Sequence, residues 1–129
     1  MLNLKKIHHI AIIASNYPKT REFYVDKLGF KIVSEVYREP RDSYKLDLEV
    51  GGQYQIEIFS FPTAPPRPSS PEACGLRHLA FEVDDINETI KELNDRGIAT
   101  EPIRIDPSTG KQFTFFADPD GLPLELYEA

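Results

Sequence analysis

The sequence has few of the features that mark secreted, membrane or disulfide-linked proteins. Its single cysteine, Cys74, has no second thiol with which to form an internal disulfide or a cysteine-based zinc site. No apolar run reaches about 18 residues, the length that spans a bilayer, and the N-terminus lacks the pattern of a signal peptide. We therefore expect a cytoplasmic protein without a membrane segment.

Positive charge is also too sparse and too scattered for a nucleic-acid-binding surface. The chain has 15 Lys and Arg against 21 Asp and Glu, which gives a formal net charge of −6. Binding to a phosphate backbone requires clustered basic residues. We therefore expect a small-molecule substrate and a second copy of the chain as partners, and no nucleic acid.

What the chain does contain is enough apolar residues for one compact core. Its 129 residues are 40% hydrophobic, and we predict a single domain over residues 1–129. Residues 7–14 read as an apolar strand. A helix is then predicted to begin after Ser15 or Asn16 and to end before Gly29. Three strands should follow, over 30–37, 43–50 and 53–61, with Gly51-Gly52 as a hairpin turn between the last two.

The same order of elements begins again after a proline-rich stretch, 62–75, which cannot continue a sheet and is predicted to be a linker. "RHLAFEV" reads as a strand, and "DDINETIKELNDRG" reads as a capped helix that ends at Gly97. Further strands are predicted over 98–105, 111–117 and 122–128. The chain is thus predicted to consist of two βαβββ units, 5–61 and 76–128.

The two units can be aligned letter by letter. "IHHIAIIASN" aligns with "LRHLAFEVDD", which places His9 on His78, and "QIEIFSF" aligns with "PLELYEA", which places Glu57 on Glu125. Glu57 follows His9 by 48 residues, and Glu125 follows His78 by 47. Each unit is therefore predicted to supply one histidine from its first strand and one glutamate from its last.

Strand alternation places these four side chains on the faces opposite to the helices. A carboxylate flanked by branched aliphatic residues is costly to bury unless it is paired, hydrogen-bonded or bound to a cation. Two imidazoles and two carboxylates could satisfy one another through a divalent ion, and such mixed nitrogen and oxygen ligands suit Zn, Ni, Co, Mn or Fe. We therefore predict a metal site or a shared polar site formed by His9, Glu57, His78 and Glu125.

The repeated order of elements, with "HHIAI", "IEIF", "RHLAFEVDDI" and "FADPDGLPLELYE", resembles the vicinal oxygen chelate superfamily, and most closely glyoxalase I and its bacterial relatives. The resemblance covers residues 5–128. It implies an α+β fold in which two tandem βαβββ units form an incompletely closed eight-stranded barrel around a metal site. It also implies one divalent metal ion per site, with His9, Glu57, His78 and Glu125 as ligands. His8 does not match a ligand position.

For function, the resemblance implies a glyoxalase I-like lyase or isomerase. Such an enzyme converts the hemithioacetal of a 2-oxoaldehyde and a thiol into a 2-hydroxyacyl thioester, by glutamate-mediated proton transfer through a metal-stabilised enediolate. By the family pattern the base is Glu125, and Glu57 is its symmetric counterpart. The family pattern also implies a homodimer, in which the ligands come from one chain or from two. No residue can be assigned to a thiol carrier, although Arg21, Arg38 and Arg77 are candidate cations.

Other members of the superfamily offer alternative functions. Methylmalonyl-CoA epimerase is the strongest, because its second-half strand is similar to "RHLAFEVDDI" and its chemistry is also proton transfer. Extradiol dioxygenases and fosfomycin-inactivating thiol transferases use three protein ligands, so a fourth ligand at Glu57 disfavours both. Metal-free drug-binding proteins with this fold lack the ligand set, which is complete here.

Overall fold

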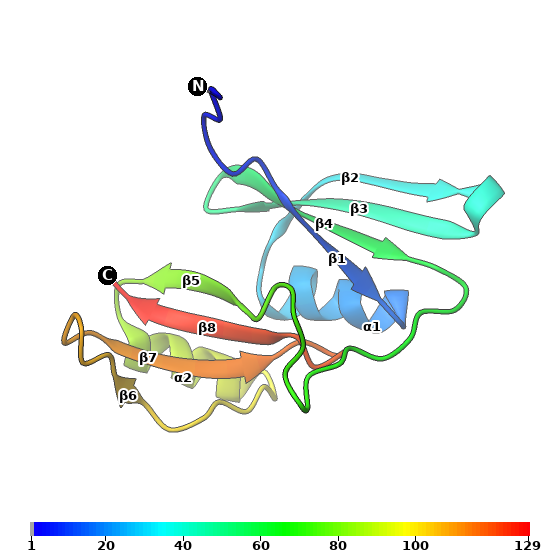
Figure 1. Cartoon of the computed structure of the whole chain (residues 1–129). Helices are drawn as coiled ribbons and strands as arrows, with labels where there is room; N and C mark the ends of the chain where they lie inside the picture. Colours follow the sequence, from blue (N-terminus) through cyan, green and yellow to red (C-terminus); the bar gives the residue numbers. More distant parts are fainter. Residues whose placement is uncertain (1) are drawn as a thin grey trace. The chain divides into compact units, whose positions relative to one another are not determined.

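The computed structural model describes residues 2–129 and divides the chain into two compact units, Met1–Pro66 and Arg67–Ala129. Each unit contains one four-stranded mixed sheet (Figure 1). The predicted α+β class with two tandem βαβββ units is confirmed. The eight strands lie in two open sheets, as the predicted unclosed barrel requires.

The first unit contains β1 (Ile10–Ala14), α1 (Tyr17–Arg21), β2 (Lys31–Arg38), β3 (Ser43–Val50) and β4 (Gln53–Ser60). A π-helical turn, η1 (Glu22–Lys27), continues α1, and a 3-10 turn, η2 (Glu39–Arg41), joins β2 to β3. The strand order is β1-β4-β3-β2, with β1 parallel to β4 and the other neighbours antiparallel.

The local sequence explains where these elements begin and turn. The Asn16 side chain accepts a hydrogen bond from the Lys19 backbone N–H and so caps α1, as predicted. Gly51 and Gly52 both have positive φ, 58° and 83°, which is the backbone that a two-residue hairpin with the twist of its strands requires. The core between helix and sheet is apolar: Ile12, Ala14, Leu46 and Ile58 of the strands and Tyr24 of η1 are all buried.

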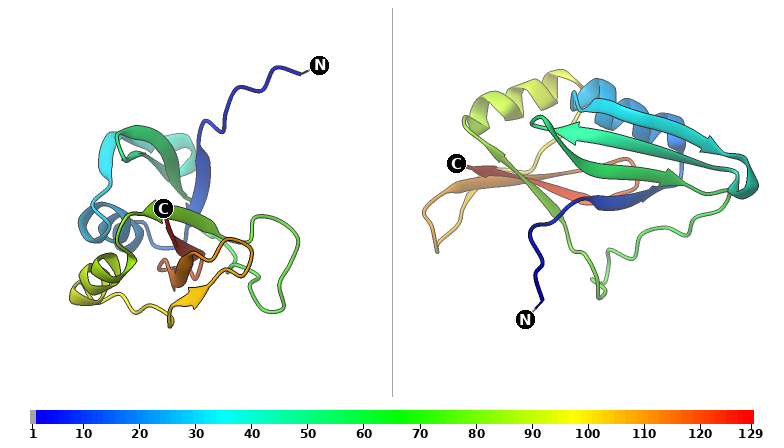
Figure 2. Two further views of the ribbon diagram at one scale, coloured as in Figure 1. Left: turned by 90° about the vertical axis from the view of Figure 1, so that its left-hand side faces the viewer. Right: turned by 90° about the horizontal axis from the view of Figure 1, so that it is seen from above.

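The second unit repeats this design with β5 (Leu79–Val83), α2 (Ile86–Asp95), β6 (Arg104–Ile105), β7 (Gln112–Ala117) and β8 (Pro123–Glu128). The strand order is β5-β8-β7-β6, with β5 parallel to β8. Asp85 caps α2 by accepting from the Glu88 backbone N–H. Figure 2 shows α2 on one side of this sheet. Ile86 and Leu93 of α2 are buried. No helix within residues 2–129 has the length and apolar character needed to cross a membrane.

Three predicted strands differ from the structure by two residues or more. The strand predicted over 98–105 is reduced to Arg104–Ile105, because Pro102 has no N–H to donate to a neighbouring strand. The first strands of both units begin later than predicted, at Ile10 and Leu79. His9 and His78 therefore each lie one residue ahead of a strand rather than within it. The extent of the linker and the number of domains stay predictions.

Candidate metal centre and adjoining pocket

In the first unit, strand register brings His9 to Glu57. Glu57 pairs with Ala11 across the parallel strands β1 and β4. Because side chains alternate, His9, two residues before Ala11, faces the same side of the sheet as Glu57. The His9 Nε2 atom lies 3.5 Å from the Glu57 Oε2 atom, and the glutamate side chain is only 10% exposed. Its neighbours Ile56 and Ile58 point to the opposite, buried side.

The second unit repeats this geometry. Glu125 pairs with Ala80 across β5 and β8, and His78 precedes Ala80 by two residues. The His78 Nε2 atom lies 3.4 Å from the Glu125 Oε1 atom, and the glutamate side chain is 12% exposed. Leu124 and Leu126, on either side of Glu125, are buried. Each unit therefore presents one imidazole and one largely buried carboxylate on the sheet face that the helix does not cover.

Both pairs have donor atoms that fit a divalent ion. Two atoms that each bind one ion at about 2.1 Å lie about 3.0–3.4 Å apart, for angles between the octahedral and tetrahedral values. The observed separations of 3.5 and 3.4 Å are close to that range. Within the described residues no group of three or more His, Cys, Asp or Glu side chains is placed to hold an ion. The four-residue ligand set therefore stays a prediction that combines the two pairs.

The surroundings of Glu57 are polar and restrain its carboxylate. The Tyr54 hydroxyl donates a hydrogen bond to Glu57 Oε2. The Lys45 ammonium lies 3.8 Å from the same oxygen and 2.8 Å from Asp47 Oδ1. Burial, and then the hydrogen bond to Glu57, raises the pKa of Tyr54 well above its usual value. The phenol therefore remains protonated and continues to donate to Glu57.

The surroundings of Glu125 are aromatic instead. The cross-strand partner of Glu57 is Asp47, whereas the partner of Glu125 is Phe115. The Phe115 ring packs edge-on against the His78 ring, with 5.1 Å between centroids. Among residues 2–129, Glu125 has one hydrogen bond or ion pair, the contact with His78. Its carboxylate is thus less restrained than that of Glu57.

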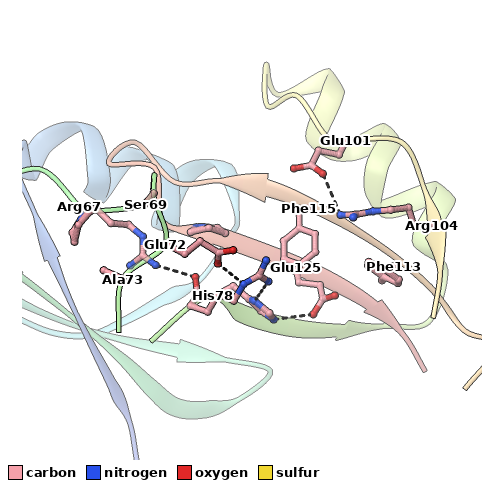
Figure 3. A pocket seen from close by; sticks show the side chains of 13 residues that line it. Arg67, Ser69, Glu72, Ala73, His78, Glu101, Arg104, Phe113, Phe115 and Glu125 are labelled. Carbon is pink, nitrogen blue, oxygen red and sulfur yellow. Dashed lines mark hydrogen bonds and ion pairs between the residues drawn. The ribbon is translucent and has the colours of Figure 1, made fainter. Parts of the chain in front are cut away.

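A pocket of about 640 Å³ adjoins Glu125 in the second unit, and its lining includes His78, Glu125 and Phe115. In Figure 3 the His78 and Glu125 side chains point toward each other, with Phe115 and Arg104 on the Glu125 side. Three arginines, Arg67, Arg77 and Arg104, contribute positive charge to the lining. This volume is typical of a small-molecule site.

The structure places the other residues that the sequence singled out as follows. Arg21 pairs with Glu35, and Arg38 donates to the Ser43 hydroxyl and lies over the Phe59 ring. Neither arginine lines the pocket. Of the three candidate cations, Arg77 lines the pocket. Cys74 is exposed and unbridged. The rings of His8 and His9 approach through their Nδ1 atoms, 2.9 Å apart.

Sequence reasoning missed three site residues: Tyr54, Lys45 and Arg104. The contacts of Lys45 and Arg104 depend on the register between neighbouring strands, and the contact of Tyr54 with Glu57, within β4, lies beside a register shift between β3 and β4. The alignment of the two repeats provides neither the register nor the shift. A signal was present in the alternation of Lys45 with Asp47, and of Phe113 with Phe115. Each alternating pair marks the face of a strand that meets the glutamate of its unit.

Comparison with known proteins identifies the family. Residues 6–126 match the model of the Glyoxalase/Bleomycin resistance protein/Dioxygenase superfamily. The chain is 63% identical to the uncharacterized protein YwkD of Bacillus subtilis (strain 168) over 125 residues, which cover 97% of this chain and 98% of YwkD. It is 28% identical to the mitochondrial methylmalonyl-CoA epimerase of Homo sapiens over 136 residues, which cover 98% of this chain and 76% of the epimerase.

A solved structure agrees with this assignment. The glyoxalase family protein from Enterococcus faecalis superposes with a TM-score of 0.90 at 58% identity, covering 96% of this chain and 98% of that one. The similarity spans both βαβββ units rather than one of them. The chain belongs to the Glyoxalase/Bleomycin resistance protein/Dioxygenase superfamily.

Proposed function

We propose that the chain is a metal-dependent enzyme of the glyoxalase I type, which converts a hemithioacetal of a 2-oxoaldehyde and a thiol into a 2-hydroxyacyl thioester. One observation supports the proposal above the others. Two His–Glu pairs occupy the same register in the two units, and Glu125 of the second pair lines a pocket of small-molecule size.

In this proposal His9, Glu57, His78 and Glu125 together hold one divalent ion, which is Ni, Co, Zn, Mn or Fe. A bound ion of this kind supplies Lewis-acid polarisation of a substrate carbonyl oxygen. The chain's own residues orient the substrate in the pocket and move its proton. Family membership supports an enzyme of this kind, and the reaction itself is what the proposal adds.

The reaction needs one base on one side of the substrate. A carboxylate takes the proton from the carbon that bears sulfur, and the same carboxylate returns it to the adjacent carbonyl carbon. One C–H bond breaks and another forms, the proton of the hemithioacetal hydroxyl is lost while the former carbonyl oxygen gains one, and no external oxidant or reductant is required. Glu125 suits this role because it lines the pocket and has one polar partner, whereas Glu57 contacts His9, Lys45 and Tyr54.

An epimerase reaction is the second candidate, supported by the 28% identity to methylmalonyl-CoA epimerase. Epimerisation removes a proton from one face of a carbon and returns one to the other face, so it requires a base on each side. Glu57 would then have to act together with Glu125. The restraint of Glu57 by Tyr54 and Lys45 favours the reaction with one base.

The test is an absorbance assay for thioester formation by metal-loaded protein. Methylglyoxal is combined with glutathione and with other low-molecular-weight thiols, and methylmalonyl-CoA racemisation is measured in parallel. We expect thioester formation, and we expect Glu125→Gln to lower kcat by at least about 100-fold, the usual contribution of a general base. Glu92→Gln, on the exposed side of α2, is the matched control and should keep full activity.

Two results would contradict the assignment. Full activity of the Glu125→Gln enzyme would exclude Glu125 as the base. Racemisation of methylmalonyl-CoA, without thioester formation from any thiol, would move the assignment to the epimerase. The homodimer and the cytoplasmic location stay predictions, which gel filtration with light scattering and cell fractionation would check.

A further inference from the structure

The second unit differs from the first in a way that the repeat does not require. Lys45 pairs with Val36 and with Phe59 across the first sheet, and Phe113 pairs with Arg104 and with Tyr127 at the matching positions of the second. Charged Lys45 and Asp47 are thus replaced by aromatic Phe113 and Phe115, while apolar Val36 is replaced by Arg104. The open face of the second sheet therefore carries two aromatic rings, Phe113 and Phe115, with the Arg104 guanidinium over them.

The Arg104 guanidinium makes cation–π contacts with both the Phe113 ring and the Phe115 ring. Its guanidinium carbon lies 5.0 Å from the Phe113 centroid and 5.4 Å from the Phe115 centroid. The two rings meet edge-on at 6.1 Å, and Phe115 also meets His78. Cation–π contacts of this kind orient the guanidinium plane without using its N–H donors.

Of the three arginines in the pocket, Arg104 has the most donors available for a ligand. Arg67 Nη2 donates to the backbone carbonyls of Leu76 and Arg77, and Arg77 Nε lies 2.5 Å from Glu72 Oε1. Arg104 contacts Glu101 through Nη2 at 3.2 Å, with both side chains more than half exposed. An exposed ion pair of this kind is weak and gives way to a ligand that binds better.

We propose that Arg104, Phe113 and Phe115 form a subsite for an anionic oxygen group, a carboxylate or a phosphate, on the untransformed part of the substrate. A planar guanidinium binds such groups through two parallel hydrogen bonds. The subsite adjoins the reacting end of the pocket, because Phe115 is the cross-strand partner of Glu125. Phe113 lies two residues farther along β7, about 7 Å, so the subsite lies beside the reacting end rather than at it.

This inference rests on the proposed function, because it names the substrate class of the same site. It predicts that the thiol carrier is anionic rather than neutral. A carboxylate-bearing carrier and a phosphate-bearing carrier share the required chemistry, and the choice of probes separates them. Binding measured without turnover separates this inference from the proposed reaction.

In the experiment, the metal-free protein, as the whole chain, is titrated with three thioethers. Binding is measured from the shifts of the amide and arginine Nε–H signals in 1H–15N NMR spectra. S-methylglutathione carries carboxylates, S-methyl-4′-phosphopantetheine carries a phosphate, and S-methyl-N-acetylcysteamine is neutral. We expect at least one anionic probe to bind with shifts at Arg104, Phe113 and Phe115. The Arg104→Gln variant should bind that probe about tenfold more weakly, the loss expected for one charge-assisted contact.

Matched variants make the result specific. Arg41→Gln removes the same charge from an exposed position of the first unit and should bind all probes like the wild type. Arg104→Lys keeps the charge but loses the planar fork, so its affinity should lie between those of the wild type and Arg104→Gln. The inference is overturned if Arg104→Gln binds the anionic probes as tightly as the wild type does. It is also overturned if the wild type binds neither anionic probe, or prefers the neutral one.

Discussion

At the residue scale, Glu57 and Glu125 occupy matching positions in the two units, yet the Glu57 carboxylate has more polar contacts than the Glu125 carboxylate. Tyr54 and Lys45 contact the Glu57 carboxylate, and the equivalent contacts are absent around Glu125 within residues 2–129. Residues that contact a ligand's side chain fix its orientation and so raise the affinity for the ion. We interpret Glu57 as the fixed ligand and Glu125 as the glutamate that is free to move a proton.

Removing the Tyr54 hydroxyl should therefore weaken metal binding. In Tyr54→Phe the ring remains and the hydrogen bond to Glu57 is lost. We expect the affinity for the divalent ion to fall about tenfold, the lower end of the usual effect of such partners. Competition with a chelating dye measures the change.

Tyr37→Phe is the control for this prediction, because Tyr37 donates a hydrogen bond to Asp42 near η2 and does not contact Glu57. Its metal affinity should equal that of the wild type. Equal affinities of the Tyr54→Phe and wild-type proteins would show that Tyr54 does not position Glu57.

The residues of the two His–Glu pairs could be predicted from the sequence, because the repeat aligns His9 with His78 and Glu57 with Glu125. The structure brings the members of each pair together. Most of the residues around them could not be predicted, since the contacts of Lys45 and Arg104 combine side chains from different strands, and that of Tyr54 lies beside a register shift between β3 and β4. Arg104 is the clearest case: it meets Phe113 through the pairing of β6 with β7, in a strand of two residues.

At the scale of elements, a charged cluster attaches α1 to β2 in the first unit. Glu35 of β2 accepts hydrogen bonds from the Tyr17 hydroxyl and from Arg21, whose Nε lies 2.8 Å from Glu35 Oε2. The hydrogen bonds from Arg21, and then from Tyr17, hold the pKa of Glu35 below its usual value. The ionised carboxylate is therefore stabilised by folding, and it helps to hold the helix against the sheet.

Glu35→Gln should lower the free energy of unfolding by about 1 kcal/mol near pH 7. Because the folded-state pKa of Glu35 is lowered, its contribution is present above the unfolded value near 4.5 and is lost as the pH falls through the folded value. The difference between wild type and variant should thus shrink in acid. Urea unfolding at several pH values measures this.

Glu39→Gln, in the exposed turn η2, is the control and should leave stability unchanged at every pH. A difference between wild type and Glu35→Gln that stays constant down to pH 3 would contradict the role given to the Glu35 carboxylate.

Most elements could be predicted because their ends carry strong local signals. Asn16 and Asp85 cap the two helices, and the Gly51-Gly52 turn sets the register of β3 against β4. The segment before β6 could not be predicted from its apolar pattern, because Pro102 limits the pairing there. The Glu101 backbone N–H nevertheless bonds to the Phe115 carbonyl, so this segment still lies against β7.

At the scale of the whole molecule, the two repeats share a backbone plan but present different chemistry. The open face of the first sheet places Lys45 and Asp47 beside its glutamate, whereas that of the second places Phe113 and Phe115 there. We interpret this difference as two separate roles: the first unit restrains a metal ligand, and the second unit binds the substrate. Such asymmetry is compatible with one backbone plan because these side chains lie outside the apolar cores.

The central claim is that one histidine and one glutamate from each unit together bind a divalent ion. The most direct measurement is elemental analysis of protein equilibrated with Ni, Co or Zn and then separated from free metal. The account predicts about one ion per chain for the wild type, and at least a tenfold loss of affinity for both His9→Gln and His78→Gln. Wild-type protein that retains no ion, or His9→Gln and His78→Gln proteins that retain as much as the wild type, would contradict it.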